Sequence, residues 1–487
     1  MGVAIQTQFK TTPDGLMQVK VVDCSTTVLY SQFFIDAEGW PGVKIRLTRK
    51  GAEHVKNVGV KILNEEIPRL KGFNAEHSFS QPGIEGKVLL SEVQVLRYLP
   101  PRFTSLSFLP PSYILLQLDG IDIALTGRFL GLIGLISIQG AVTGDIRQMG
   151  VAIQTEFKTT PDGLMQVKVV DCSTTVLYSQ FFIDAEGPFS GFVKTFEVQI
   201  NDMIRYRIPS VFCNSLQKFI EDASPALFKD DIRDTPFFPP PMRTTNDSDR
   251  MLYLYGSEYL FNSLLFHAYE GNRLLLEIDE ASLPAQYKGL VRTTCANASN
   301  GDFIASLCLG KLIPEVAKQF PNTTSSFMLL PHELPEFQLA DGVGTIDLKT
   351  RVITYIKEGL RRRQVLVSSA DTIADVRLLV EDHKFAAAFK LHKLAVSLHR
   401  SAIGGVGSDD ISQLAPLAKT FLGPQISKAL RQGVPFPLQD SLEFINPQLT
   451  IHDGFVELAT DFRLGETKLR KEVKQAFGLN FFSDESP

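Results

Sequence analysis

The histidines, cysteines and acidic residues of this chain are the side chains that could carry out chemistry, and their spacing predicts no catalytic site. No Gly-x-Ser-x-Gly elbow is present, which argues against a lipase or esterase of that type. His332 and Glu333 lie in the segment PHELPE, which lacks the second histidine of a zinc-protease motif. His392 and His399 are too isolated to suggest a metal site. We therefore expect no catalytic residue, no metal ion and no cofactor.

The elements that would position a site begin with an alternating segment. Residues 43–48 alternate apolar with polar side chains, which predicts a half-buried strand. Apolar residues at helical spacing across 52–67 predict a helix, which Pro68 should end. Residues 79–187 are mostly of strand type. The apolar phase of this run changes at Gly120, which predicts a β-bulge.

The same plan then starts again. A second helical region is predicted across 193–230. Beyond it, residues 251–255 predict a strand, and Ser257 could cap the helix that follows. Strand-like segments run across 274–400, and a closing helical region is predicted at 411–432. The order of strand, long helix, strands and long helix thus occurs twice and predicts two similar halves.

A literal duplication is superimposed on this plan. Residues 1–39 recur as residues 149–187 with one difference, Gln8 against Glu156. Two such copies cannot both occupy the same native environment. Residues 149–187 continue the run of strands, so we take that copy as native and expect residues 1–39 to lie outside the native fold. The alternative is that residues 1–39 add a real strand pair at the N-terminus.

Composition and charge limit the class of protein. A chain of 487 residues is long enough for about two or three domains. The net charge of −5 gives no reason to expect a nucleic-acid partner. The sequence has no stretch of apolar, uncharged residues long enough for a membrane span. Residues 1–39 also lack the pattern of a secretion signal.

Several blocks of sequence resemble the family of bactericidal/permeability-increasing, lipopolysaccharide-binding and plasma lipid-transfer proteins. The segments FFPPPM and DRMLYLYGSEYLFNSLLFHAYEG (within 237–271), IPEVAKQFPN (313–322) and QGVPFPL (432–438) are similar to its second half. PGVKIRLTRKGAEHV (41–55) resembles the start of the mature family chain. The blocks occur in the family's order, and the resemblance extends from residue 40 to about residue 464.

The resemblance implies an α+β fold in the form of an elongated, two-lobed boomerang. Each lobe would be a twisted antiparallel sheet wrapped around a long helix, and a central sheet would join the lobes. The N-terminal lobe would span 40–233 and the C-terminal lobe 250–464. Between them, residues 234–249 contain three consecutive prolines and form a linker. Residues 465–487 would be a polar tail, to which we assign no function.

The resemblance also implies an apolar pocket in each lobe for the acyl chains of phospholipid or lipopolysaccharide. Each buried CH₂ contributes about 0.8 kcal/mol, so a dozen contribute on the order of 10 kcal/mol before association costs. One exposed charge–phosphate contact gives only about 1 kcal/mol or less. Acyl chains should therefore dominate affinity, although any single lining residue could equally pack as core. The expected lining residues are Val43, Ile45, Val55, Ile62, Leu116, Leu118, Phe196, Ile200, Leu260, Leu264, Leu417 and Phe421.

The cysteines and sequons favour a secreted glycoprotein. The family's disulfide in the first half matches Cys172 and Cys213. Setting aside Cys24, the duplicate of Cys172, leaves an even number of cysteines, and parity then suggests Cys295–Cys308 as a second disulfide. Paired cysteines and sequons are typical of the secretory route. The sequons are at Asn246, Asn297 and Asn322.

The predicted tip of the first half differs from that of the family's endotoxin binders, which carry clustered lysines and arginines there. In the corresponding stretch, 126–144, Arg128 is the only charged residue, which weakens the case for attraction to the phosphates of lipid A. The apolar residues Phe129, Leu132 and Ile133 suggest a tip that dips into a lipid surface. The alternative is that these residues are covered strand positions.

Together these features predict a secreted, non-enzymatic lipid-binding protein. Its role would be innate defence against bacteria or lipid transfer, and the neutral tip favours lipid carriage. One rival is an extracellular interaction scaffold of the same fold, with its pockets filled by side chains. A second rival is an esterase with an unrecognised nucleophile.

Overall fold

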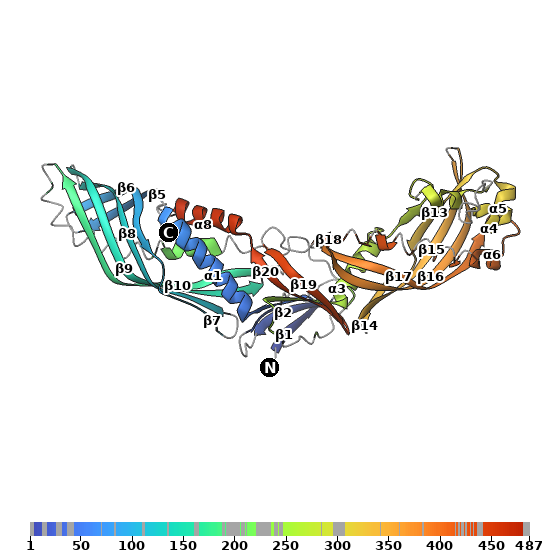
Figure 1. Ribbon diagram of the computed structural model, residues 1–487, viewed down its shortest axis with the longest axis horizontal. Helices are drawn as coiled ribbons and strands as arrows, with labels where there is room; N and C mark the ends of the chain where they lie inside the picture. The colour runs from blue at the N-terminus through green and yellow to red at the C-terminus, as the bar shows by residue number, and fades with distance from the viewer. Residues whose placement is uncertain are drawn as a thin grey trace.

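The computed structural model is elongated, with a lobe at each end and a sheet between the lobes (Figure 1). The predicted α+β class and boomerang-like outline are confirmed. The structure describes residues 4–11, 17–25, 32–36, 43–69, 71–81, 84–109, 113–133, 136–159, 165–187, 212–220, 235–237, 247–283, 285–295, 307–340, 342–359, 361–381, 384–413, 433–435 and 442–480, with isolated positions at 190, 205, 210, 242, 415, 416, 419, 423, 426–428, 430 and 431.

A six-stranded antiparallel sheet forms the first lobe, in the order β10-β9-β8-β6-β5 with β7 paired to β8. The predicted bulge is present, because the β8–β9 register shifts between Leu118 and Ile121. Gly120 there has a φ of +80°, which glycine adopts without a steric penalty. The strands are β5 (Lys71–Gln81), β6 (Ile84–Leu99), β7 (Phe103–Leu109), β8 (Tyr113–Ile133), β9 (Ile136–Thr159) and β10 (Met165–Glu186).

Helix α1 (Arg49–Glu66) crosses the first lobe and begins earlier than the spacing predicts. Thr48 is its N-cap, and the Thr48 Oγ1 accepts a hydrogen bond from the Gly51 backbone N–H at 3.3 Å. This cap satisfies one of the N–H groups that a helix start leaves without a partner. A 3₁₀ turn, Ile67–Arg69, contains the predicted terminator Pro68 and ends the helix.

A five-stranded sheet joins the lobes, and its burial corrects one prediction. The alternation in 43–48 predicts a polar face in contact with solvent, yet Arg46 and Thr48 are 0% and 1% exposed. The Arg46 guanidinium lies 3.9 Å from the ring centroid of Tyr253, in a layer that includes Met242. Both faces of this sheet are therefore covered here. The strands, in order, are β19 (Leu442–His452), β20 (Phe455–Leu464), β11 (Leu252–Ser257), β4 (Val43–Thr48) and β3 (Gln32–Asp36).

The second lobe is a seven-stranded sheet, in the order β12-β13-β15-β16-β17-β18 with β14 paired to β15. Helix α3 (Glu258–Glu270) begins at the predicted N-cap Ser257, whose side chain makes no capping hydrogen bond. The strands are β12 (Leu276–Ile278), β13 (Thr324–Pro331), β14 (Glu336–Ala340), β15 (Val343–Glu358), β16 (Arg361–Glu381), β17 (Lys384–Ser401) and β18 (Val434–Pro435).

The run of strands predicted across 274–400 is interrupted by helices. These are a 3₁₀ segment (Ala285–Val291), α4 (Leu309–Leu312) and α5 (Pro314–Gln319). Pro314 occupies the first turn of α5, where its missing N–H costs no hydrogen bond. Leu309, Ile313, Val316 and Phe320, spaced four, three and four residues apart, are all buried in one cluster. Of the closing helical region, the structure describes α6 (Ser408–Ser412), where Ile411 is buried.

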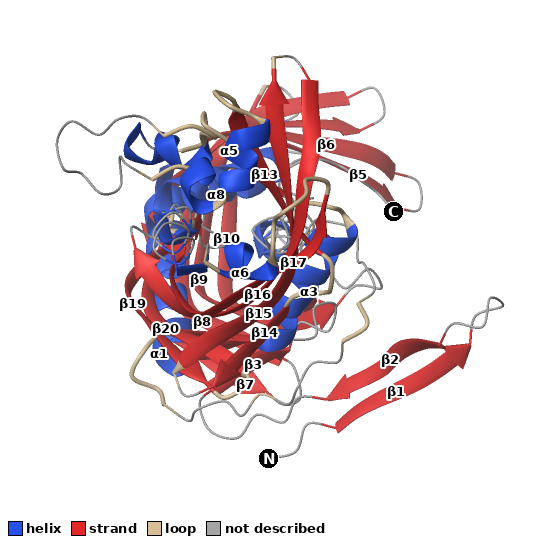
Figure 2. Cartoon of the chain, turned by 90° about the vertical axis from the view of Figure 1, so that its right-hand side faces the viewer, coloured by secondary structure: helices blue, strands red, loops and turns tan. Residues whose placement is uncertain are grey.

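The N-terminal duplicate forms the same hairpin as its internal twin. Strands β1 (Ala4–Thr11) and β2 (Met17–Ser25) pair with Ile5 opposite Cys24, as Ile153 in β9 lies opposite Cys172 in β10. Both hairpins shift register at the equivalent position. This hairpin is a separate two-stranded sheet that stands apart from the rest of the chain (Figure 2). Strand β3, also from the duplicate, joins the central sheet beside β4. That residues 1–39 lie outside the native fold stays a prediction.

Helix α8 (Glu466–Asn480) follows the last strand of the central sheet and returns to the first lobe. Figure 1 shows it beside α1, above the first sheet. This helix occupies most of the segment that was expected to be a polar tail. Its position makes the C-terminal end of the chain part of the N-terminal lobe.

Candidate functional site

The interior of the first lobe is closely packed. Helix α1, the helical segment 212–220 and α8 all contribute side chains to one cluster on the sheet. Two of the expected lipid-lining residues, Ile62 and Leu118, are 1% and 2% exposed and belong to this cluster, and Leu116 packs at its margin. The most enclosed members include Ile62, Leu118, Ile121, Ile146, Met149, Ile153, Phe212, Leu216, Val473 and Ala476.

Sequence reasoning assigned no role to α8, yet α8 fills part of this interior. Val473 and Ala476 are 1% and 2% exposed, and Leu469 packs beside them. The i, i+4, i+7 spacing of these three residues is a helical apolar stripe, and it was visible in the sequence. Because charged residues surround this stripe, the segment looks like a solvent-exposed helix in the sequence. The first lobe is therefore closed by a helix from the far end of the chain.

A group of charged residues fastens α8 to α1. The Glu66 carboxylate is almost completely buried and faces three cations. The distances from its oxygens to the nearest nitrogens of Arg69, Arg470 and Lys474 are 3.2, 3.1 and 3.4 Å. Glu66 would be costly to bury without such partners. Breaking this group should therefore loosen α8.

A second part of the same contact is exposed to solvent. Lys61 on α1 donates to Glu466 on α8 at 2.9 Å, and Arg470 donates to the same carboxylate at 3.1 Å. These hydrogen bonds hold the pKa of Glu466 below its ordinary value of 4.5. The hydrogen bonds of Arg470 to Glu65, Glu466 and Glu66 hold the pKa of Arg470 above its ordinary range, with the bond to Glu65 contributing most. The contact therefore depends on ionised carboxylates.

The second lobe differs, because its long helix is only partly covered: the rings of Phe237 and Phe266 lie 6.1 Å apart, and Thr235 hydrogen-bonds Tyr259 at 2.8 Å. Helix α3 is apolar along most of its length, and none of its residues is buried. Leu264 is 58% exposed, and Leu260 is half-buried. Both are expected lipid-lining residues. An apolar helix face that remains open in this way is the kind of surface that a ligand or partner covers.

Helix α3 is nevertheless fixed in place on its other side. The Asn262 side-chain amide donates to the Phe337 carbonyl at 2.8 Å and accepts from the Phe337 N–H at 2.8 Å, both on β14. The rings of Phe261 and Phe337 lie 4.9 Å apart, and Leu265 packs in the same cluster. A rigid helix thus presents an open apolar face beside a docked one.

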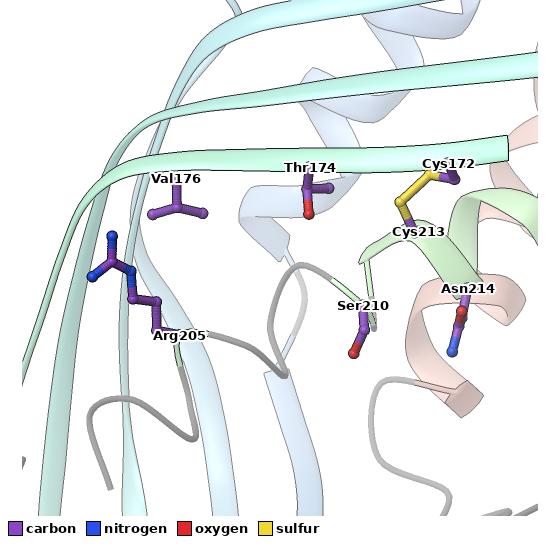
Figure 3. Close-up of a pocket in the computed structure, with 7 residues that line it drawn as sticks. All are labelled: Cys172, Thr174, Val176, Arg205, Ser210, Cys213 and Asn214. Atoms are coloured by element: carbon purple, nitrogen blue, oxygen red, sulfur yellow. A yellow bond between two sulfur atoms is a disulfide. The ribbon is translucent and has the colours of Figure 1, made fainter. Parts of the chain in front are cut away.

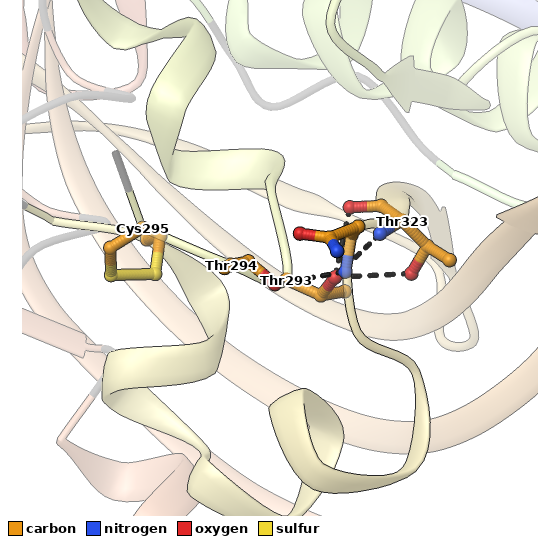
Figure 4. Close-up of a disulfide and its surroundings, with 6 residues drawn as sticks. Thr293, Thr294, Cys295 and Thr323 are labelled. Carbon is orange, nitrogen blue, oxygen red and sulfur yellow. Dashed lines mark hydrogen bonds between the residues drawn. A yellow bond between two sulfur atoms is a disulfide. The ribbon is translucent and has the colours of Figure 1, made fainter. Parts of the chain in front are cut away.

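Both expected disulfides are present in the structure. Cys172–Cys213 ties β10 to the segment 212–220, and Cys295–Cys308 closes a shorter loop ahead of α4. Beside the second disulfide, Thr293 and Thr323 hold two loops together (Figure 4). The Thr293 Oγ1 donates to the Thr323 carbonyl at 2.9 Å and accepts from the Thr323 N–H at 2.9 Å.

One of the three sequons lies in the described part of the chain. Asn322 is exposed, with a φ of +56°, and its backbone N–H donates to Thr294 Oγ1 at 2.9 Å. The side chain is therefore accessible to modification at the end of the lobe. Glycosylation itself stays a prediction.

The residues expected at the tip of the β8–β9 hairpin differ in their exposure to solvent. Phe129 is 5% exposed and packs with Ile138 and Val142, so it is a covered strand residue. Leu132 is 36% exposed. The Arg128 Nε lies 3.4 Å from the Glu92 carboxylate, so the one cation of this stretch already has a partner. An insertion surface at the tip would have to use Leu132 rather than Phe129.

The other expected residues are scattered or lie outside the description. Val55 is 38% exposed on α1, and Ile45 packs at the margin of the central cluster around Leu252 and Phe444. Val43 and Ile133 are placed in β4 and β8, without a description of their side chains. The expected residues outside the described part are Phe196, Ile200, Leu417, Phe421, Asn246 and Asn297.

The described residues contain neither a metal-type cluster nor a membrane-spanning helix. Within the described residues, no group of three or more histidine, cysteine, aspartate or glutamate side chains could hold a metal ion. In the same part of the chain, no helix is both long and apolar enough to cross a bilayer.

Comparison with known proteins gives the class. Residues 222–464 match the profile described as the LBP/BPI/CETP family, C-terminal domain. The match ends with β20, so α8 lies beyond it. This chain is a member of the LBP/BPI/CETP family.

Individual relatives align with both lobes. The bactericidal permeability-increasing protein of Sebastes schlegelii is 21% identical over 86% of this chain and 95% of its own length. The phospholipid transfer protein of Homo sapiens is 23% identical over 88% and 91%. The lipopolysaccharide-binding protein of Bos taurus is 20% identical over 87% and 94%. The names of these relatives describe binding and transfer rather than catalysis, in agreement with the prediction that the chain is not an enzyme.

Proposed function

We propose that this chain is a secreted lipid-binding protein that holds the acyl chains of a phospholipid-type lipid along the open face of α3. The observation that carries the proposal is that α3 is apolar, rigidly docked, and has no buried residue. Family membership supports the same class of ligand, because relatives are named for phospholipid and lipopolysaccharide. Two disulfides are consistent with an oxidising, extracellular setting.

We further propose lipid carriage rather than attack on bacterial surfaces. A lipopolysaccharide binder needs cations that are free to meet phosphates. At the first-lobe tip, Arg128 is engaged with Glu92. Apolar contact along α3 needs no such cations.

The direct test is identification of bound lipid in protein purified from its own secretory source, by native mass spectrometry and lipid extraction. Co-purified phospholipid supports the proposal. The sharper test replaces Leu264 with Asp in the full chain. Because Leu264 is 58% exposed, the variant should fold, and the charge on α3 should reduce bound lipid several-fold.

The matched control is Leu96→Asp, on β6 of the first lobe. Leu96 is also 58% exposed, so both changes place a carboxylate at an equally accessible leucine. The proposal predicts loss of lipid in the α3 variant alone. Equal lipid content in the two variants would contradict it.

A second candidate is an extracellular scaffold of the same fold that carries no lipid. The filled interior of the first lobe, into which α8 inserts Val473 and Ala476, favours it. Protein from the secretory source that is free of lipid, and that takes up none from phospholipid vesicles, would support the scaffold.

A further inference from the structure

An open pocket of about 430 Å³ lies in the first lobe beside the Cys172–Cys213 disulfide (Figure 3). One wall is β10, from which Cys172, Thr174 and Val176 line the pocket at alternate positions, as the pleat of a strand requires. Cys172 and Val176 also pack against the first-lobe core. The pocket therefore adjoins the apolar interior on this side. The disulfide fixes the distance between this wall and the opposite one.

The opposite wall supplies polar groups. Arg205, Ser210 and Asn214 line it, and Figure 3 shows the Arg205 side chain extending towards β10 near Val176. No carboxylate is among the lining residues that the structure describes. The lining thus combines a single positive charge with hydroxyl and amide groups on one side, and apolar atoms on the other.

Arg205 differs from other arginines of the first lobe. Arg97, Arg102, Arg128 and Arg147 each lie within ion-pair distance of a carboxylate. In the part of the chain that the structure describes, Arg205 has no such partner. Arg205 is exposed, and none of the described residues that line the pocket carries a negative charge.

The donors in this pocket match an anion with several oxygens. A guanidinium presents its N–H groups as a planar fork that fits phosphate oxygens in pairs. The hydroxyl group of Thr174 and the amide of Asn214 can donate to further oxygens. Charge-assisted hydrogen bonds of this kind are the stronger ones in proteins. A carboxylate offers two acceptor oxygens, whereas inorganic phosphate offers four, and a phosphodiester adds two weaker ester oxygens to its two charged ones.

We infer that this pocket binds a phosphate group, either the phosphodiester of a lipid headgroup or free phosphate. The headgroup version rests on the proposed function, because it takes the ligand to be a phospholipid. The anion site itself does not depend on α3, which lies in the other lobe. Recognition of the polar end of a ligand would then occur beside the disulfide rather than at the hairpin tip.

The test is calorimetric titration of the full chain with three soluble probes: inorganic phosphate, dihexanoyl phosphatidylglycerol and hexanoate. Three variants are compared with the unmodified chain: Arg205→Gln, Arg205→Lys and the control Arg377→Gln. Arg377 is an exposed arginine on β16 of the second lobe, outside the pocket. Both sites are exposed, so circular dichroism should show unchanged folding in all three variants.

Arg205→Gln should weaken phosphate-probe binding about tenfold to hundredfold, the range for losing a charged hydrogen-bond donor. Arg205→Lys should recover part of the affinity, because lysine keeps the charge but not the fork. Arg377→Gln should change nothing. Binding of phosphatidylglycerol far above inorganic phosphate would support the headgroup as the source, and comparable binding would support free phosphate.

Two results would overturn the inference. One is that Arg205→Gln leaves the affinity for both phosphate probes unchanged. The other is that hexanoate binds as tightly as the phosphate probes and with the same dependence on Arg205, which would make the site a carboxylate site. Failure of the proposed function would look different: loss of phosphate binding on Arg205→Gln, together with no effect of Leu264→Asp on bound lipid.

Discussion

Val473 offers a quantitative test of how tightly α8 closes the first lobe. Its side chain is 1% exposed and lies in the cluster formed with α1 and the sheet. Val473→Ala removes two buried carbons, at about 0.8 kcal/mol each, or about 1.6 kcal/mol. The cavity left behind raises the expected cost to about 2 kcal/mol. The change should therefore favour local detachment of α8 about thirtyfold.

Hydrogen exchange of the α8 amides is the suitable assay, because a molecule with two lobes does not unfold as one unit. Exchange in α8 should accelerate about thirtyfold in Val473→Ala, while the second-lobe sheet keeps its rates. The control is Lys471→Ala, an exposed position on the same helix, where the change should stay within about 0.5 kcal/mol. Equal exchange in the two variants would refute the assignment of α8 to the first-lobe core.

Three further predictions concern other parts of the molecule. Cys172→Ser opens a loop of 41 residues and should cost about 4 kcal/mol of first-lobe stability, measured by chemical denaturation; an unchanged midpoint would contradict it. The pKa of Glu466 is lowered in the fold, so its hydrogen bonds stabilise the α8 contact above about pH 4.5, and this stabilisation is lost as the pH falls through the lowered value. On acidification the protection factors of the α8 amides, which are corrected for the slower intrinsic exchange at low pH, should therefore fall, and they should fall less in Glu466→Gln. Leu132→Glu should weaken liposome flotation if the tip enters lipid, whereas Leu177→Glu, on the exposed face of β10, should not; equal flotation would exclude insertion.

Local features of the chain were predictable from the sequence. The strand at 43–48, the terminator Pro68 and the phase change at Gly120 each depend on neighbouring residues and were found as predicted, although the polar face of the strand is buried. The α4–α5 segment was also readable, since Leu309 to Phe320 repeat at helical spacing, but the surrounding strand-like pattern obscured it.

Features that depend on a distant partner were not predictable. Periodicity identifies the apolar side of α8 but not the lobe on which that side packs, which is set by a contact with α1 some four hundred residues earlier. The burial of Arg46 arises from the layer around Tyr253 and Met242 that covers the other face of the central sheet. For α3 the sequence offers two interpretations of Leu260 and Leu264, lipid lining or core, and only the structure shows that Leu264 is left open.

The candidate site was predictable in class rather than in detail. The family resemblance gives a ligand type, and the sequence gives Leu260 and Leu264 on one helix face. The sequence does not identify Arg205 as a binding residue. A single arginine suggests a site only when the residues that lie around it in the fold are known. The disulfide that forms one side of its pocket was the nearest available clue.

The duplicated hairpin has a consequence for biosynthesis. The five residues of β3 pair with β4, whereas the identical residues 180–184 pair with β9. The sequence of this pentapeptide therefore does not determine which strand it pairs with. A growing chain emerges from the ribosome with the N-terminal version first, long before β8 and the internal version are made. We therefore expect the earlier copy to compete with the later one for β8 while the first lobe is being made.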